Sequence, residues 1–252
     1  MLLLLPPSEG KARPRRGAPV DLERLAFAGE LTERRERLLD ALAALPPAPA
    51  GLEALGISEA QSAELAANRA LRAAPSAPAA RIYTGVLFER LDLPDLPAPA
   101  RRRASRDVLI ASALWGFVRP GDRIPAYRLA IGARLPGLAG LAPWWRPALD
   151  AAVPESRLVV DLRSGAYAAA WRAPAEATVT VRAFVERAGG ERRPVSHMAK
   201  RARGDVARAL LLAERRARDA EEVASAAEAA GLRVELAAAR GGGWTLDVIE
   251  RG

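Results

Sequence analysis

Lys11 and Lys200 are the two side chains whose type is least expected in this sequence. The chain has 38 lysine and arginine residues, and all the others are arginine. A lysine ammonium is a compact donor whose pKa falls on burial, whereas a guanidinium stays charged and needs room for its planar fork. Lysine in place of arginine therefore indicates a contact with a phosphate or carboxylate, or a catalytic amine. The alternative for Lys11 is a solvated surface cation.

Other rare side chains extend this set. They are the only histidine, the only asparagine and the three tyrosines, namely His197, Asn68, Tyr83, Tyr127 and Tyr167. Several stand beside short polar or glycine-bearing turns, where functional side chains often lie. Acid–base catalysis would fall to Lys11, Tyr127 and His197. A lone histidine is more often a structural hydrogen-bonding residue, which is the alternative for His197.

The segment "ALWGFVRPGDRIPAYRL" is the densest group of polar, proline and glycine residues. It follows a buried apolar run, and α/β sheets place their sites in such loops. Arg119 and Arg128 would clamp an anion, while Tyr127 would donate a hydrogen bond or stack on a base. A structural arginine–aspartate pair inside the loop, through Asp122, is the alternative.

A predicted helix over residues 196–216 has one apolar face and one basic face. Ala202, Val206 and Ala209 belong to the apolar stripe. The outward face carries Lys200, Arg201, Arg208 and Arg215. Gly204 would let a phosphate backbone approach this face closely. A solvated cationic face is the equally weighted alternative.

The segment "DLRSGAY" offers a further combination. Asp161, Ser164 and His197 can be written as a catalytic triad, but "RSGA" is not a nucleophile elbow, so this signal is weak.

The elements that must position these residues alternate between strands and helices. Apolar runs predict strands at 2–5, 107–120 and 158–162, with a strand end at 81–85. Periodic segments predict helices at 31–45, 58–72, 86–91, 196–216 and 219–230, the second with a capping box at Ser58. Hairpins are expected at 178–197 and 233–250, and connections at 94–106 and 132–143. These patterns predict a mixed α/β protein whose mixed sheet is covered by helices, with residues 1–252 as one compact domain or two closely packed lobes around a basic cleft.

Composition limits the class of protein. The net charge of +8 and the sequence pI near 10.9 favour polyanionic partners. The absence of cysteine excludes thiol chemistry and Cys-ligated metal, and a single histidine argues against a His-based metal site, so we expect no metal and no cofactor. The N-terminal "MLLLL" is too short for a membrane span or signal peptide. We expect a cytoplasmic protein with no membrane partner.

Six sequence blocks resemble one known family. They are "PPSEGK", "ISEAQSAELAANRAL", "IYTGVLFE", "SALWGFVRPGDRIPAYRL", "VVDLRSGAY" and "HMAKRARG". The same blocks occur in the same order in the peroxide-stress protein YaaA family, formerly a domain of unknown function. The resemblance implies a compact cytoplasmic α/β protein with a positively charged cleft. It also implies protection from hydrogen peroxide, limitation of free iron, and binding of duplex or branched DNA, with "AKRARG" in a helix-hairpin-helix-like DNA element.

Two functional hypotheses follow. In the first, the protein binds double-stranded or branched DNA as part of the peroxide response, limiting peroxide and iron damage. Phosphates would contact Lys11, Arg119, Arg128, Lys200, Arg201 and Arg208. Bases or sugars would contact Asn68, Tyr83, Tyr127 and Ser164. In the second, the same cleft belongs to an enzyme for a phosphorylated or nucleoside-like small molecule, with Lys11 or His197 as acid or base. A site that sequesters iron lacks the necessary ligands.

Overall fold

The computed structural model describes residues 1–187, 191–194 and 196–251, and for 194, 196–198 and 251 it describes the backbone alone. The chain forms a mixed sheet of eight strands flanked by helices, which confirms the predicted fold class. The strands are β1 (Leu2–Leu5), β2 (Ala77–Pro78), β3 (Val108–Ser112), β4 (Gly116–Val118), β5 (Arg123–Ile124), β6 (Val159–Asp161), β7 (Thr178–Glu186), β8 (Arg192–Pro194), β9 (Val234–Ala238) and β10 (Trp244–Arg251). The α-helices are α1 (Ala28–Ala43), α2 (Ala50–Leu55), α3 (Ser62–Arg69), α4 (Ala79–Ile82), α5 (Val86–Leu91), α6 (Ala98–Asp107), α7 (Leu141–Ala152), α8 (Gly165–Ala168), α9 (Ser196–Leu212) and α10 (Ala220–Ala229).

Strand β1 lies inside the sheet, between β3 and β6. The strand order is β4-β3-β1-β6-β7-β10-β9, with β8 beside β7, while β2 and β5 form a separate pair. Strands β3, β1, β6, β7 and β10 are mutually parallel along this path. After β1 the chain enters β3 on one side and later β6 on the other, so the strand order reverses at β1. Ligands of open α/β sheets bind at the carboxyl ends of the strands at such a point.

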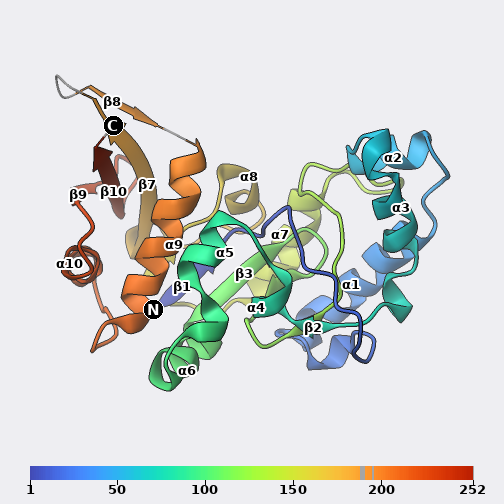
Figure 1. Ribbon diagram of the computed structural model, residues 1–252, viewed down its shortest axis with the longest axis horizontal. Coiled ribbons are helices and arrows are strands. Elements are labelled where there is room, and N and C mark those ends of the chain that lie inside the picture. The colour runs from blue at the N-terminus through green and yellow to red at the C-terminus, as the bar shows by residue number, and fades with distance from the viewer. Residues whose placement is uncertain (188–190, 195, 252) are drawn as a thin grey trace.

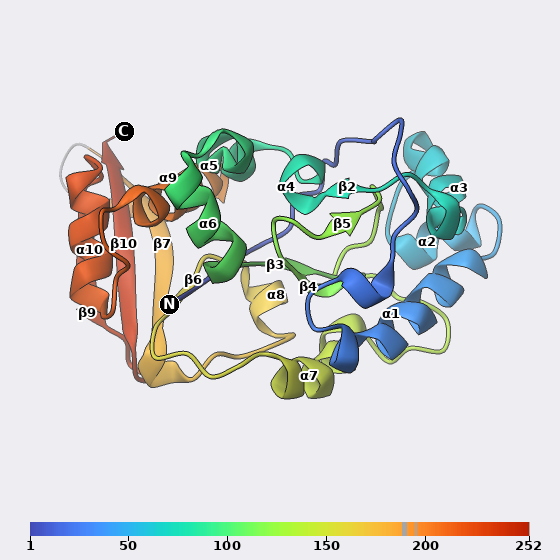
Figure 2. The same ribbon diagram turned by 90° about the horizontal axis from the view of Figure 1, so that it is seen from below.

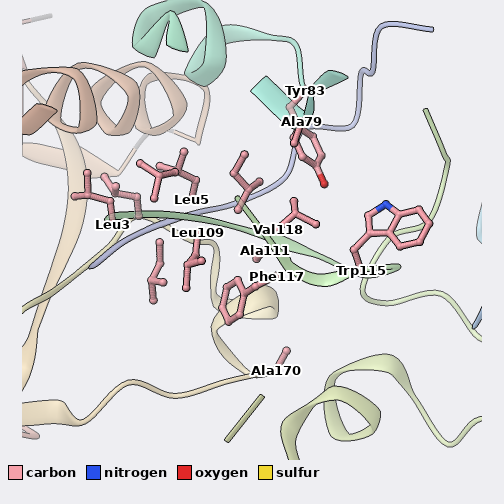
Figure 3. Close-up of a cluster of buried hydrophobic side chains, with 14 of the residues drawn as sticks. Leu3, Leu5, Ala79, Tyr83, Leu109, Ala111, Trp115, Phe117, Val118 and Ala170 are labelled. Atoms are coloured by element: carbon pink, nitrogen blue, oxygen red, sulfur yellow. The ribbon is translucent and has the colours of Figure 1, made fainter. Parts of the chain in front are cut away.

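The central strands are apolar because helices cover both of their faces. Every residue of β1 and β3 is buried, as expected for parallel strands inside an α/β sheet. Leu3 and Leu5 of β1 pair in register with Val108 and Ile110 of β3. Figure 3 shows Leu3 and Leu5 on one face of these strands and Leu109 and Ala111 on the other. This core fixes the direction in which the loops after β1 and β3 leave the sheet.

The helices divide between the two faces and the two ends of the sheet. Figure 2 shows α5, α6 and α9 on one face of the central strands, and α7 and α8 on the other. Helices α1, α2 and α3 lie at one end of the molecule, and α10 with β9 and β10 lies at the other (Figure 1). Glycine at Gly204 lets α9 pack closely on α5, because a Cβ there would lie 2.5 Å from the Leu87 carbonyl oxygen.

Several predicted elements are confirmed. The strands predicted at 2–5 and 158–162 correspond to β1 and β6, and the helices predicted at 31–45, 86–91 and 219–230 correspond to α1, α5 and α10. The two predicted hairpins correspond to the antiparallel pairs β7–β8 and β9–β10. The Ser58 capping box is present and begins a helical stretch made of a 3-10 turn, Glu59–Gln61, followed by α3. Helix α9 ends at Leu212, earlier than expected.

Other predictions were wrong. The stretch "RIYTG" is the end of helix α4 and a single β-bridge between Tyr83 and Lys11, and is not a strand. Residues 94–106 include helix α6, because its alanines and arginines are good helix formers and its proline lies in the first turn, where it is tolerated.

The apolar run 107–120 is a hairpin of β3 and β4 and not the single strand predicted. The Ser112 hydroxyl oxygen accepts hydrogen bonds from the backbone N–H groups of Leu114 and Trp115, at 3.2 and 2.9 Å, which holds the turn. Gly116 closes it with a φ of 73°, a value that favours glycine. The turn places a hydroxyl at the carboxyl end of β3.

Candidate functional site

Loops from three parallel strands meet at one edge of the sheet. Residues 6–11 follow β1, Ser112 ends β3, and the segment from Asp161 to Tyr167 follows β6. Because β1, β3 and β6 run parallel, their carboxyl ends share this edge. The site described below therefore lies where the topology predicts one.

Lys11 is positioned by the loop after β1. Its backbone pairs with Tyr83, and the neighbouring Ser8 hydroxyl accepts the Thr84 N–H at 3.0 Å. The Lys11 Nζ donates to the Ser8 carbonyl at 2.8 Å and lies 4.3 Å from the centre of the Tyr127 ring. The amine is thus held between a backbone carbonyl and an aromatic face.

The surroundings of Lys11 lower its pKa to about 8, from 10.5 for an ordinary lysine. Burial is the main cause, and the positive charge of Arg128 adds to it. The carboxylates of Glu64 and Glu9 oppose the shift. At neutral to mildly alkaline pH, therefore, both the ammonium and the neutral amine are populated.

A buried hydrogen-bonded chain lies behind Lys11. The Tyr127 hydroxyl is 2.7 Å from the Ser112 Oγ and 3.0 Å from the Tyr83 hydroxyl. A serine hydroxyl has two lone pairs and one proton, and both Ser112 lone pairs already accept backbone N–H groups. Ser112 must therefore donate to Tyr127. The Tyr83 hydroxyl points toward the end of the hairpin that carries Trp115 (Figure 3).

The two tyrosines of this hydrogen-bonded group, Tyr83 and Tyr127, stay protonated. Burial is the main cause that raises the pKa of Tyr83 and of Tyr127 above its ordinary value, since a phenolate loses its hydration there. They are only 2% and 3% exposed, respectively. Tyr127 thus lines the cavity and Tyr83 hydrogen-bonds to it from behind, both as neutral phenols, whereas the pKa of Lys11 is lowered to about 8.

Asn68 holds the backbone of Arg128 from both sides. Its Nδ2 donates to the Arg128 carbonyl at 2.6 Å, and its Oδ1 accepts the Arg128 N–H at 2.9 Å. Only 1% of Asn68 is exposed. This gives Asn68 a different role from the predicted base or sugar contact, because its amide is used in fixing Arg128.

A cavity of about 310 Å³ opens beside the Lys11 amine. It is lined by Glu9, Gly10, Lys11, Arg13, Glu64, Ala126, Tyr127 and Arg128. Arg13 Nη2 pairs with a Glu64 carboxylate oxygen at 2.6 Å, while Arg128 Nη1 lies 3.9 Å from a Glu9 carboxylate oxygen. Three cations and two carboxylates thus surround a pocket the size of a small ligand. The lining therefore carries both signs of charge, with one more cation than carboxylates.

Comparison with known proteins identifies the family. The family model described as "Peroxide stress protein YaaA" matches residues 1–237. The chain belongs to this family. A UPF0246 protein of Streptomyces coelicolor is 44% identical over 259 residues, which cover 99% of this chain and 98% of the relative. A UPF0246 protein of Corynebacterium efficiens is 43% identical, covering 94% and 95% of the two chains. A more distant relative from Cereibacter sphaeroides is 37% identical over 58% of this chain and 60% of its own length.

In this YaaA-family chain, Arg119 lies apart from the Lys11 cavity. Its Nη1 donates to the carbonyls of Ser105 and Arg106, at 3.0 and 2.7 Å, at the end of α6. Its backbone N–H donates to the Asp122 carboxylate at 2.9 Å. The structure therefore uses Arg119 to hold α6 and the β4–β5 loop, close to the structural alternative expected for this loop.

The predicted cations of α9 do not line this cavity. Lys200 and Arg201 are exposed, and Arg201 lies 3.9 Å from Asp205 on the same helix. Arg208 is half-buried, and its guanidinium donates to the Leu91 carbonyl at 2.9 Å. Gly204 faces α5, so it serves helix packing in place of the expected approach of a phosphate backbone.

Asp161 is not available for the triad with Ser164 and His197. Arg163 Nε and Nη2 bind the two carboxylate oxygens of Asp161, at 2.9 and 2.7 Å, which commits this acid to a structural pair. Ser164 precedes α8 as its N-cap residue. The side chain of His197 lies outside the described residues.

Sequence reasoning missed Ser112, Glu9, Arg13 and Glu64. Ser112 could have been found, because it is a lone hydroxyl in the buried run "VLIASALW". Arg13 and Glu64 line the cavity from the β1 loop and α3, and nothing in their spacing links them. In the part of the chain that the structure describes, no three histidine, cysteine, aspartate or glutamate side chains are grouped to hold a metal ion. No described helix is long and apolar enough to cross a membrane.

Proposed function

We propose that this protein acts in the peroxide stress response through the Lys11 cavity, as a cytoplasmic enzyme for a small anionic molecule. The observation that carries the proposal is a partly buried amine with a pKa of about 8 beside a second cation, Arg128, on a small cavity. Perturbed titratable groups in pockets mark candidate catalytic sites.

The size and charge of the cavity favour a phosphorylated or nucleoside-like ligand. About 310 Å³ accommodates a small molecule and not a duplex. Arg128 and Arg13 suit a phosphate or carboxylate, since guanidinium groups bind such oxygens through paired N–H donors. Glu9 and Glu64 can accept hydrogen bonds from sugar hydroxyls or base N–H groups.

Lys11 is the acid–base group of this proposal. A group with a pKa near the working pH both gives and takes protons efficiently. Tyr127 would orient the reacting group and hold its own proton, because its pKa is raised.

Ligand binding tests this function. We would titrate the protein with AMP and with inorganic phosphate in a calorimeter, using the wild type, Lys11→Arg, Arg128→Ala and the control Lys200→Arg. The two pocket variants should lose at least about tenfold in affinity, or 1.4 kcal/mol. The control should match the wild type. Equal affinities in all four proteins would place the anion outside the cavity and overturn the proposal.

A second function, DNA binding, is favoured by the charge of the chain. The net charge is +8, and Lys200 with Arg201 forms an exposed pair of cations on α9, outside the cavity. We propose that duplex or branched DNA contacts this pair through its phosphates, which helps to protect DNA from peroxide and iron damage.

The salt dependence of DNA affinity tests this second function. The double variant Lys200→Ala/Arg201→Ala should bind more weakly and reduce the salt slope by about 2, since each phosphate contact contributes about 0.9. Arg157→Ala removes one exposed arginine that precedes β6, at the opposite edge of the sheet, and is the control for loss of a surface charge elsewhere. A double variant with an unchanged slope would exclude α9 from the DNA contact.

A further inference from the structure

The Lys11 amine can lose its proton without leaving a hydrogen bond unmade. The Ser8 and Glu9 carbonyls lie 2.8 and 3.5 Å from its nitrogen. A neutral amine has two N–H donors and one lone pair, so these two carbonyls satisfy both donors and the lone pair remains. A guanidinium has no comparable nucleophilic form, which explains why arginine would not serve here.

We propose that Lys11 forms an imine with an aldehyde or ketone that carries a phosphate or carboxylate group. This inference rests on the proposed function and names its substrate class. The carbonyl carbon would lie at the Lys11 nitrogen, and the anionic group would pair with Arg128. Desolvated lysines beside a second cation are the type that forms such covalent intermediates.

The step balances without a further reactant. The nitrogen lone pair attacks the carbonyl carbon, and the carbonyl π electrons move to oxygen. The two hydrogens of the neutral amine then leave with that oxygen as water, and a C=N bond remains. The chain has no cysteine, so no thiol competes for the carbonyl group.

The walls of the cavity suit this chemistry. Nζ lies 4.3 and 5.6 Å from the ring centres of Tyr127 and Tyr83, so two aromatic faces limit the water that reaches the new C=N bond. Arg128 Nη1 is 3.9 Å from the nearest Glu9 carboxylate oxygen, a distance that leaves its guanidinium available for a ligand anion. The held backbone of Arg128 fixes where that anion binds.

Reductive trapping tests the proposal, with pyridoxal 5′-phosphate as the probe and pyridoxal as its phosphate-free counterpart. The wild-type protein is treated with borohydride at pH 8, cleaved at arginine and analysed by mass spectrometry. The two lysines report in the same sample, so exposed Lys200 is the internal control for partly buried Lys11. Fragment spectra separate Lys11 from the Met1 amine, which lies in the same peptide.

Lys11 should be trapped at least tenfold faster than Lys200, and its trapping should fall at least tenfold with pyridoxal or in Arg128→Ala. At pH 8 about half of an amine with a pKa near 8 is neutral, roughly a hundredfold more than for an unperturbed lysine. Equal or faster trapping at Lys200 would overturn the imine. If pyridoxal 5′-phosphate binds reversibly and Arg128→Ala weakens it, but no adduct forms at Lys11, the imine is wrong and the anion pocket stands. If it neither binds nor forms an adduct at Lys11, both proposals fail.

Discussion

The Lys11 nitrogen lies 4.3 Å from the centre of the Tyr127 ring, and the hydroxyl of that ring accepts a hydrogen bond from Ser112. One aromatic side chain therefore connects the titrating amine of the cavity to the buried hairpin of β3 and β4. The position of the amine depends on how the core of the sheet is packed.

Two substitutions of Tyr127 should distinguish the effect of its ring on the Lys11 pKa from the effect of its hydroxyl. Tyr127→Phe keeps the aromatic face and should leave the pKa of Lys11 near 8, whereas Tyr127→Leu removes a cation–π contact of about 0.5–1 kcal/mol and should lower that pKa by under one unit. An NMR titration with isotope-labelled lysine measures this, because the chain has only two lysine signals and Lys200→Arg assigns them. A lower pKa in Tyr127→Phe than in Tyr127→Leu would contradict the ring contact.

Lys11 should make stability depend on pH above neutrality. Its folded-state pKa lies below its unfolded value, so between pH 8 and 10.5 the unfolded state binds more protons and the unfolding free energy rises with pH. Relative to Lys11→Met, the wild type should gain roughly 2–3 kcal/mol across this window. Urea denaturation at several pH values measures the difference. Lys200→Met, which changes an exposed lysine, is the control. If the difference in unfolding free energy between the wild type and Lys11→Met did not change with pH, Lys11 would not be desolvated.

Asn68→Ala should weaken both stability and ligand binding. It leaves the N–H and carbonyl of Arg128 without their partners, at a cost of about 2–3 kcal/mol, and frees the segment that carries the anion-binding side chain. Ser76→Ala is the matched control, because Ser76 is also buried and donates to the Ala18 carbonyl at 2.7 Å, away from the cavity. Only Asn68→Ala should reduce phosphate affinity in the calorimeter. An equal loss of phosphate affinity in both variants would mean that the hydrogen bonds from Asn68 to Arg128 contribute to stability alone.

Gly204→Ala should destabilise the packing of α9 on α5. The added Cβ would lie 2.5 Å from the Leu87 carbonyl oxygen, so the helices must move apart, at a cost of about 1–3 kcal/mol. Gly29 in α1 has no atom within 4 Å of its Cβ position, and Gly29→Ala should raise stability by up to about 1 kcal/mol. Thermal unfolding of both variants checks this. A Gly204→Ala protein of full stability but weaker DNA binding would restore the phosphate role for this glycine.

The fold could be predicted from sequence where a pattern was local. The buried run Leu2–Leu5 and the periodic helix near Ala28–Ala43 each carry enough information in adjacent residues. The hairpin within 107–120 was missed, because its turn lies inside an apolar run and is held by a side-chain hydroxyl, Ser112, in addition to Gly116.

The residues of the site could be predicted from their rarity, but their individual roles were harder to predict. Rarity singled out Lys11, Tyr83, Tyr127 and Asn68, and the structure brings these four together with Arg128. The role of Asn68 depends on a partner 60 positions away, and the pocket residues Arg13 and Glu64 are 51 positions apart. Such pairings arise only from the tertiary arrangement of the loops.

Because β1 lies between β3 and β6, its strand neighbours are synthesised at different times after it. Leu2–Leu5 leave the ribosome before the other strands, yet β6, on one side of β1, begins only at Val159. At 5–20 residues per second this is a delay of roughly 10–30 s, during which four leucines lack one of their neighbours. These apolar side chains stay incompletely covered during that time, and the Lys11 cavity cannot be complete until Arg128 has been made.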